Sequence, residues 1–239
     1  MQIRNALITG AGTRLGKAMA LALAEDGFNV AVHYHSSARE AEAVAEEIRA
    51  MGQGAAVLRA DLLDATEVDV LVPAAVAALG GPLTVLVNNA SVFEYDRLET
   101  ATAESWDRHI GSNLRAPFFL TQAFAAQVPE TVADDRGEPE AQALVINMLD
   151  QRIRKLTPEF ATYTIAKMGL WAFTVSLTPI AVAMFTALVT NRCAPTGKPT
   201  TPSAKYIAMR HPGIDISAPS TSAKSTISPA AIWARASLI

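Results

Sequence analysis

The sequence has few of the features that mark secreted or membrane proteins. Its one cysteine, Cys193, has no partner for an internal disulfide, which fits a reducing compartment. Residues 1–4 lead straight into an apolar segment, without the basic stretch, apolar core and small-residue cleavage site of a secretory signal. Both absences predict a cytoplasmic protein.

Charge is also scarce. Charged residues make up 18% of the chain and the formal net charge is -3, so no excess of positive charge attracts nucleic acid or anionic lipid. Half of the residues are hydrophobic, which is enough for one domain with a well-buried core. We therefore expect a small-molecule partner, and we expect no nucleic acid, no membrane and no bound metal.

One stretch, 168–191, contains no charged residue and is long enough to span a bilayer. Pro179 and several Ser and Thr residues interrupt it, and its first half continues the helical pattern of a polar segment upstream. The pattern favours a buried, packed helix over a transmembrane span.

Acidic residues almost disappear from the last quarter of the chain. Of the 23 Asp and Glu residues, 22 lie in 1–176, and only Asp215 lies beyond. Segments 196–203 and 217–228 are rich in Ser, Thr and Pro and lack the periodicity of a helix or strand. We divide the chain into a folded domain over 1–190 and an atypical tail over 191–239, which we interpret as disordered or translated out of frame.

Strand-like and helical patterns alternate before the tail. Apolar, β-rich runs at 6–9, 29–34, 55–60, 83–88 and 143–147 are separated by helical patterns at 17–26, 38–51, 67–79 and 104–128. Strands that are apolar on both faces indicate a parallel sheet covered by helices on each side. A polar segment with Gly and Pro at 134–142 predicts a surface loop. The predicted fold class is α/β, with a doubly wound, mostly parallel sheet in a Rossmann-like three-layer sandwich and an irregular C-terminal tail.

The first predicted strand ends in a glycine-rich turn, 10–16, that leads into a helix. In such a turn, backbone N–H groups and the helix N-terminus can meet a pyrophosphate, and glycine is needed where the backbone approaches closely. Gly10 and Gly16 stand at the two ends of the turn. The signal alone is weak, because an ordinary tight turn between a strand and a helix has the same composition.

The residues after the second predicted strand indicate which dinucleotide is bound. An NAD site usually places an acid here for the ribose hydroxyl, and none is present. The hydroxyls of Ser36 and Ser37, with cations at Arg39 and Arg14, suit a 2′-phosphate instead. Either serine can also simply cap the next helix. Asp61, after the third strand, can accept a hydrogen bond from an adenine amino group or serve as a helix-start acid.

Tyr163 and Lys167 are spaced to lie on one face of a predicted helix. A nearby ammonium lowers the pKa of a phenol, which lets tyrosine exchange a proton near neutral pH. The same spacing occurs by chance on many solvated helix faces, so the pair gains its meaning only from the other motifs.

Taken together, these features resemble the short-chain dehydrogenase/reductase family. The motifs fall in the family's order: Gly10-x-x-x-Arg14-x-Gly16, Asp61, Asn88-Asn-Ala, Asn113 and Tyr163-x-x-x-Lys167. The resemblance covers residues 1 to 176 and implies a proton relay of Asn113, Tyr163 and Lys167 beside a nicotinamide. It implies a cofactor, NADPH, bound by Gly10, Arg14, Leu15, Gly16, His35, Ser36, Ser37, Asp61, Leu62, Asn89, Ala90, Tyr163 and Lys167.

Three departures from the common pattern are similar to one branch, the pteridine reductases. Arg14 stands where most members have glycine, Asn-Ala-Ser-Val-Phe follows Asn88, and Asp150 stands where most have serine. The run 33–37 is also similar to that branch. The resemblance implies that Phe93 stacks on a pterin ring, although a core aromatic is the plain alternative. The implied substrate-binding residues are Arg14, Ser91, Phe93, Asp150 and Tyr163, and the implied catalytic residues are Asn113, Asp150, Tyr163 and Lys167.

The family's usual ending, a strand and an Asn-Ala-x-x-Pro-Gly turn, is not legible after the predicted catalytic helix. Three functions therefore remain open. The first is an NADPH-dependent oxidoreductase acting on a dihydropterin or dihydrofolate-like substrate. The second is a reductase of another carbonyl, such as a 3-oxoacyl thioester. The third is a catalytically impaired dinucleotide-binding protein. We expect a homo-oligomer, dimer or tetramer, if the tail permits it.

Overall fold

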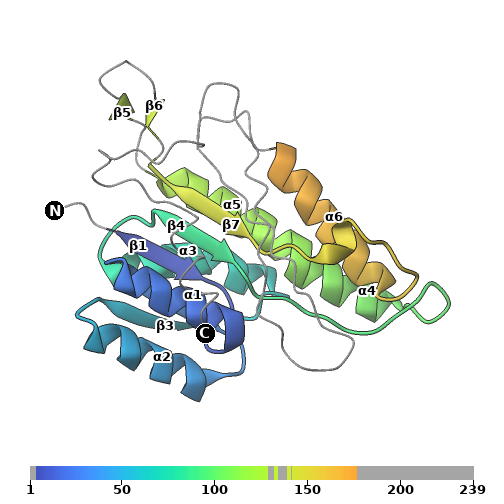
Figure 1. The fold of residues 1–239 in the computed structure, drawn as a ribbon, viewed down its shortest axis with the longest axis horizontal. Coiled ribbons are helices and arrows are strands. Elements are labelled where there is room, and N and C mark those ends of the chain that lie inside the picture. Colours follow the sequence, from blue (N-terminus) through green and yellow to red (C-terminus); the bar gives the residue numbers. More distant parts are fainter. Residues whose placement is uncertain (1–3, 129–131, 134–138, 141, 177–239) are drawn as a thin grey trace.

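The structure is a computed structural model that describes residues 4–128, 132–133, 139–140 and 142–176 (Figure 1). The tail at 191–239, with Cys193, and the last part of the predicted domain lie outside the described residues. The strands are β1 (Asn5–Ile8), β2 (Asn29–Tyr34), β3 (Ala55–Arg59), β4 (Val85–Asn88), β5 (Val132–Ala133), β6 (Pro139–Glu140) and β7 (Leu144–Asn147). The helices are α1 (Arg14–Glu25), α2 (Ala38–Ala50), α3 (Ala65–Leu79), α4 (Ala103–Ile110), α5 (Ala116–Gln127) and α6 (Ala161–Ser176), with a π-helical turn η1 (Gly111–Arg115) and a 3-10 turn η2 (Gln151–Ile153).

Five strands form one sheet in the order β3-β2-β1-β4-β7, and every neighbouring pair is parallel. Because β1 stands in the middle, the chain winds outward in one direction to β3 and in the other to β7. The predicted doubly wound sheet is confirmed. The predicted loop at 134–142 is wrong in one detail, because Pro139–Glu140 pairs with Val132–Ala133 as a short antiparallel ladder.

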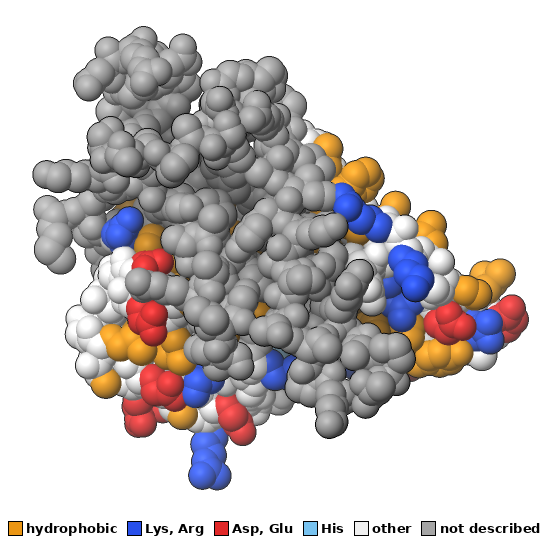
Figure 2. Space-filling model, viewed as in Figure 1, with side chains coloured by type: hydrophobic (Ala, Val, Ile, Leu, Met, Phe, Trp, Pro, Cys, Tyr) orange, Lys and Arg blue, Asp and Glu red, His pale blue; other side chains and the backbone are white. Residues whose placement is uncertain are grey.

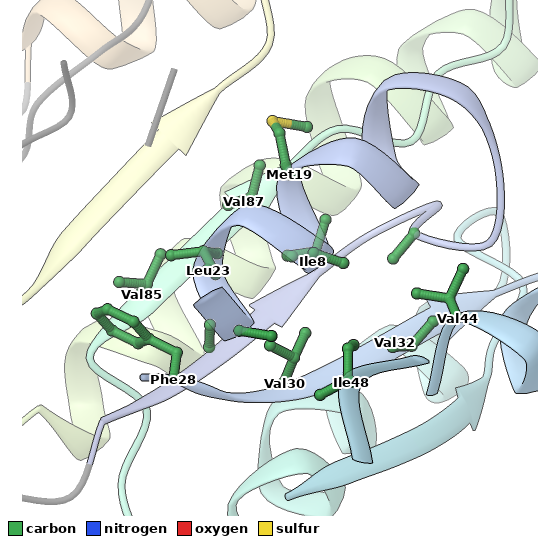
Figure 3. Packing of buried hydrophobic residues seen from close by; sticks show 14 of the residues in the cluster. Ile8, Met19, Leu23, Phe28, Val30, Val32, Val44, Ile48, Val85 and Val87 are labelled. Atoms are coloured by element: carbon green, nitrogen blue, oxygen red, sulfur yellow. The ribbon is translucent and has the colours of Figure 1, made fainter. Parts of the chain in front are cut away.

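Alternate side chains of the sheet enter two separate cores. On one face, Ile8, Val30 and Val87 pack against α1 and α2, where Leu23 and Ile48 are fully buried (Figure 3). On the other face, β-strand side chains from the same sheet pack against α3 and α5. The result is the predicted three-layer sandwich, with strands that are apolar on both faces because both faces are covered.

The predicted helix at 104–128 is divided rather than continuous. It consists of α4, the π-helical turn η1 and α5, and the N–H of Ala116 donates to the carbonyl of Gly111. Pro117 has no N–H for the carbonyl of Asn113 four residues earlier, so the regular ladder cannot continue through it. Such π turns are often found at functional sites. This one contains Asn113.

Among the described helices, none is both long and apolar enough to cross a membrane. Helix α6 covers the described part of the uncharged stretch that begins at residue 168, and it packs against α4 and η1. On the face shown in Figure 2, side chains of both charge signs lie interspersed with hydrophobic ones over the described surface.

Candidate active site

The predicted cofactor residues share one edge of the sheet. Because all five strands are parallel, the turns that follow β1, β2, β3 and β4 meet at their carboxyl ends. The first turn leads into α1, the second into α2 and the third toward α3. The fold thus brings together the four segments that the sequence proposed for dinucleotide binding.

The glycine-rich turn needs both of its terminal glycines. Gly10 has a φ of +64°, which glycine adopts without strain. A Cβ on Gly16 would lie 2.1 Å from the carbonyl oxygen of Gly10, so α1 begins in direct contact with the turn. Arg14, the first residue of α1, has a φ of +51° and an exposed side chain. Glycine suits this position because the backbone is left-handed. An arginine in the same conformation is strained, which favours a functional use of its side chain.

Thr9, which the sequence did not single out, and Asn89, a predicted cofactor residue, hold this turn. The Thr9 hydroxyl accepts from the N–H groups of Asn89 and Ala90 at 2.9 and 3.0 Å. The Asn89 amide donates to the carbonyls of Thr9 and Gly10 at 2.9 and 3.1 Å. The predicted cofactor residues Asn89 and Ala90 are therefore bonded directly to the glycine-rich turn.

His33, on β2, supports the turn from the other side. Its Nδ1 accepts from the Gly10 N–H at 3.0 Å, so its Nε2 carries the proton, 3.1 Å from the carbonyl oxygen of Ala60. Burial lowers the pKa of His33 to about 4, against a weaker opposing effect of the Ala60 carbonyl. The ring is neutral at neutral pH, which the bond from Gly10 requires.

The segment after β2 presents two serine hydroxyls beside the start of α2. Ser37 is the N-cap residue of α2, but its side chain makes no capping hydrogen bond, and His35 and Ser36 are exposed. His35 Nε2 lies 3.7 Å from Asp61 Oδ2, which links the ends of β2 and β3. Helix capping by the serine side chain, the plain alternative for Ser37, is absent here. Within the described part of the chain, no hydrogen bond occupies this hydroxyl.

Asp61 also has a local role. One of its carboxylate oxygens accepts from the Leu63 N–H at 2.9 Å, and its own N–H donates to Glu67 at 2.7 Å. The neighbouring Leu62 is buried in the core beside α3. Asp61 Oδ2 faces His35 rather than the backbone, so the local turn leaves one oxygen for another partner.

Tyr163 and Lys167 lie on the buried face of α6. Asp150, the partly buried residue before η2, lies beside the Tyr163 hydroxyl. The Tyr163 hydroxyl donates to Asp150 Oδ2 across a long 3.4 Å, and Lys167 Nζ lies 5.7 Å from the centre of the tyrosine ring. Lys167 donates to the Met148 carbonyl at 2.8 Å and is 3% exposed. Burial lowers its pKa to about 8, while Asp150 acts in the opposite direction.

The expected lowering of the Tyr163 pKa is wrong for this structure. Burial, followed by the charge of Asp150, raises the pKa of Tyr163, and a hydrogen bond with Ser91 opposes this more weakly. The sequence could not show that the phenol is buried or that the carboxylate faces it. A phenol with a raised pKa keeps its proton at neutral pH and can donate it.

Asn113 serves the loop after β4. Its side-chain oxygen accepts from the Val92 N–H at 2.9 Å, and its side-chain nitrogen donates to the Val92 carbonyl at 2.8 Å. Both ends of the buried amide are thereby used. The predicted part of Asn113 in a proton relay stays a prediction, and what the structure places on this side chain is the anchoring of the segment with Ser91 and Phe93.

Phe93 is not a core aromatic, because 53% of its surface is exposed. Its ring packs edge-on against Tyr163, with centroids 4.7 Å apart, and lies parallel to Phe160 at 4.3 Å. The guanidinium of Arg152 covers the Phe160 ring at 4.3 Å. Sequence reasoning missed Phe160 and Arg152. Their positions beside Tyr163 and Asp150 were the available signal, but the stacking depends on a φ of +58° at Phe160 that no pattern predicts.

The described residues hold no cluster of three or more potential metal ligands. A parallel sheet with a glycine turn at its carboxyl edge, and a buried Tyr–Lys pair beside the partly buried Asp150, are features of a dinucleotide-binding α/β protein. More specifically, the chain belongs to the short-chain dehydrogenase family, whose model matches residues 4–195. The predicted family is confirmed.

Two curated relatives illustrate the range within the family. The 3-oxoacyl-[acyl-carrier-protein] reductase FabG of Staphylococcus aureus is 40% identical over 125 residues, which cover 52% of this chain and 50% of that protein. Pteridine reductase 1 of Leishmania tarentolae is 34% identical over 206 residues, covering 72% of this chain and 69% of that protein. The chain thus spans about half the length of the first, and the second supports the pteridine reductase-like branch.

Solved structures give the same picture. FolM alternative dihydrofolate reductase 1 from Brucella suis, in complex with NADP, is 35% identical, with a TM-score of 0.70 over 78% of this chain and 74% of that one. The landomycin C-6 ketoreductase LanV, with bound NADP and rabelomycin, is 30% identical, with a TM-score of 0.68 over 78% of this chain and 75% of that one. Similar folds therefore act on chemically different substrates.

Proposed function

We propose that this protein is an NADPH-dependent reductase of a pteridine, either a dihydropterin or a dihydrofolate-like molecule. The observation that carries the proposal is the position of the exposed Phe93 ring, 4.7 Å from the Tyr163 ring, with Asp150 bonded to the tyrosine hydroxyl. A flat heterocycle needs an aromatic face for binding and a proton donor at its edge, and this arrangement offers both.

The residues fit NADPH. Gly10 and Gly16 let the turn pack closely on Ala90 and on the start of α1, and a helix start of this kind suits a pyrophosphate. The hydroxyls of Ser36 and Ser37, together with the exposed Arg14 and Arg39, suit a 2′-phosphate, and no acid at this turn repels it. The NADP in the solved structures of relatives supports the same cofactor.

The chain's own residues account for proton delivery. NADPH, when bound, supplies a hydride to the ring carbon of a C=N bond. Tyr163 is protonated at neutral pH and donates its proton to the adjacent ring nitrogen. Asp150 orients the phenol and can order a water that donates a proton to the same nitrogen. Lys167, which is still mostly charged at neutral pH, places a cation beside the phenol as it loses its proton.

A test compares substrates and cofactors in one assay. We expect NADPH oxidation with dihydrobiopterin or dihydrofolate, little with acetoacetyl thioester, and preference for NADPH over NADH. Changing Arg39→Asp should reduce this preference, because a carboxylate repels the 2′-phosphate. Equal binding of NADPH and NADH by the unmodified protein would count against the cofactor assignment.

A second candidate function is the reduction of a 3-oxoacyl thioester. The 40% identity with FabG over about half of each chain favours it. It explains the cofactor residues but assigns no use to Asp150 and Phe93. Faster turnover of the thioester than of either pterin would establish this candidate instead. NADPH binding without turnover of any of these substrates would indicate a catalytically impaired binding protein.

A homo-oligomer is also proposed. Several large apolar side chains on the described parts of α5 and α6 are exposed, and such a patch often marks a contact between proteins. These are Phe118, Phe119, Ile165 and Trp171. Sedimentation of the full chain tests it, with a monomer as the contrary result.

A further inference from the structure

A buried polar cluster lies behind Tyr163. It consists of Asp96 from the segment after β4, His109 from α4 and Thr162 from α6, with exposed fractions of 2%, 0% and 3%. Polar groups with so little contact with water are costly unless they are paired. Here each has a partner in the cluster, and the partners come from three separate segments.

The hydrogen bonds of the cluster have a defined direction. His109 Nε2 accepts from the Glu94 N–H at 3.1 Å, so a neutral ring carries its proton on Nδ1. That nitrogen lies 2.6 Å from the Thr162 hydroxyl, which in turn donates to Asp96 Oδ2. Burial lowers the pKa of His109 against the opposing charge of Asp96, in agreement with a neutral ring.

Hydrogen bonds to the backbone connect the cluster with the segments that carry Phe93 and Tyr163. The Asp96 carboxylate accepts from the Thr162 N–H at 3.3 Å, and its carbonyl accepts from the Phe160 N–H at 2.7 Å. Glu94, whose N–H is held by His109, directly follows Phe93. Thr162 directly precedes Tyr163. The cluster therefore joins the backbone beside one ring to the backbone beside the other.

We propose that Asp96, His109 and Thr162 are positioning residues that hold the Phe93 ring against Tyr163 and so fix where a flat substrate lies relative to the phenol. None of the three contacts the hydroxyl of Tyr163, so their effect passes through the two rings. The expected effect on turnover rests on the proposed function, whereas the expected effect on the ring contact does not. A displacement of about 1 Å at a reacting group can lower the rate by on the order of a hundredfold.

The matched variants are Thr162→Val and Thr162→Ser in the full chain. Valine keeps the shape but removes the hydroxyl that links His109 to Asp96, whereas serine keeps the hydroxyl. For Thr162→Val we expect a fall in kcat for dihydrobiopterin of about a hundredfold, a raised KM for the pterin, and a Kd for NADPH within about twofold of the original. Thr162→Ser should recover most of the loss.

A second readout does not need any substrate. In protein with labelled Phe and Tyr rings, the Phe93–Tyr163 ring contact seen by NMR should weaken in Thr162→Val and persist in Thr162→Ser. If Thr162→Val does not fold, Asp96→Asn replaces it, because it keeps the side-chain size, removes the charge and replaces one of the two accepting oxygens by an NH2 donor. Failure of the unmodified protein to reduce any pterin overturns the proposed function alone. An unchanged ring contact in a folded Thr162→Val or Asp96→Asn protein overturns the positioning proposal.

Discussion

His33 shows how one residue connects the sheet to the cofactor turn. Its unprotonated Nδ1 accepts from Gly10, while its carbonyl accepts from the Ala11 N–H at 2.8 Å. Protonation would place a second N–H against that of Gly10 and separate the two. The hydrogen bond from Gly10 therefore requires a neutral imidazole, and the stability of the turn depends on pH.

The sign of this dependence follows from the depressed pKa. A folded-state pKa of about 4, below the ordinary value of 6.5, gives a contribution that is complete above about pH 6.5 and is lost as pH falls through 4. The difference corresponds to about 3 kcal/mol. We expect the unfolding free energy of the original protein, measured relative to His33→Asn, to fall by this order between pH 7 and 4. Parallel pH profiles of the two proteins would contradict it.

Lys167, in contrast to His33, lowers the stability of the folded protein at neutral pH. Its pKa of about 8, against 10.5 for free lysine, means that burying its charge costs about 3 kcal/mol at neutral pH. Lys167→Met removes that charge and leaves the Met148 carbonyl without its donor, which costs about 1 kcal/mol. We expect the variant to be more stable by about 2 kcal/mol at pH 7 and to lose turnover.

The pH dependence of stability distinguishes the cost of the buried charge from an effect of side-chain packing. Below pH 8 lysine is charged in both states, whereas between about 8 and 10.5 the folded protein has lost the proton that the unfolded chain still holds. The original protein should therefore gain stability relative to Lys167→Met over that range. Denaturant unfolding at pH 7, 9 and 10.5 measures it. A constant difference between the two proteins would contradict the assigned cause.

At the scale of elements, the turn between β1 and α1 places the helix start. Gly16→Ala puts a methyl group 2.1 Å from the Gly10 carbonyl oxygen, and backbone cannot yield as a flexible side chain can. We expect a loss of more than about 2 kcal/mol of stability and at least a tenfold weaker NADPH affinity. Thermal unfolding and fluorescence titration measure the two effects.

Gly52→Ala is the matched control. Gly52 follows the end of α2 in left-handed backbone, with a φ of +85°, and a Cβ there meets no atom within 4 Å, unlike a Cβ at Gly16. Its cost should be limited to the backbone strain of about 1 kcal/mol, with unchanged NADPH binding. Equal effects of the two substitutions on NADPH affinity would show that the contact at Gly16 has no special role.

At the scale of the whole molecule, the doubly wound parallel sheet and the edge where the predicted cofactor residues lie could be predicted from the sequence. Apolar runs and helical patterns alternate, and parallel strands bring their carboxyl ends together. The stack of Phe93, Phe160 and Arg152 could not, because it depends on one left-handed residue and on contacts between distant segments. The cluster of Asp96, His109 and Thr162 could not be predicted either, because each residue alone is common in its element and the contacts join distant segments.

In the proposed reaction, Tyr163 delivers the proton during NADPH-dependent pterin reduction. The most direct test is the rate of dihydrobiopterin reduction by Tyr163→Phe beside its Kd for NADPH. The substitution removes the hydroxyl and keeps the ring against Phe93, so we expect a fall in kcat of about a thousandfold or more with NADPH affinity nearly unchanged. A Tyr163→Phe protein that reduces the pterin at close to the original rate would show that another group delivers the proton.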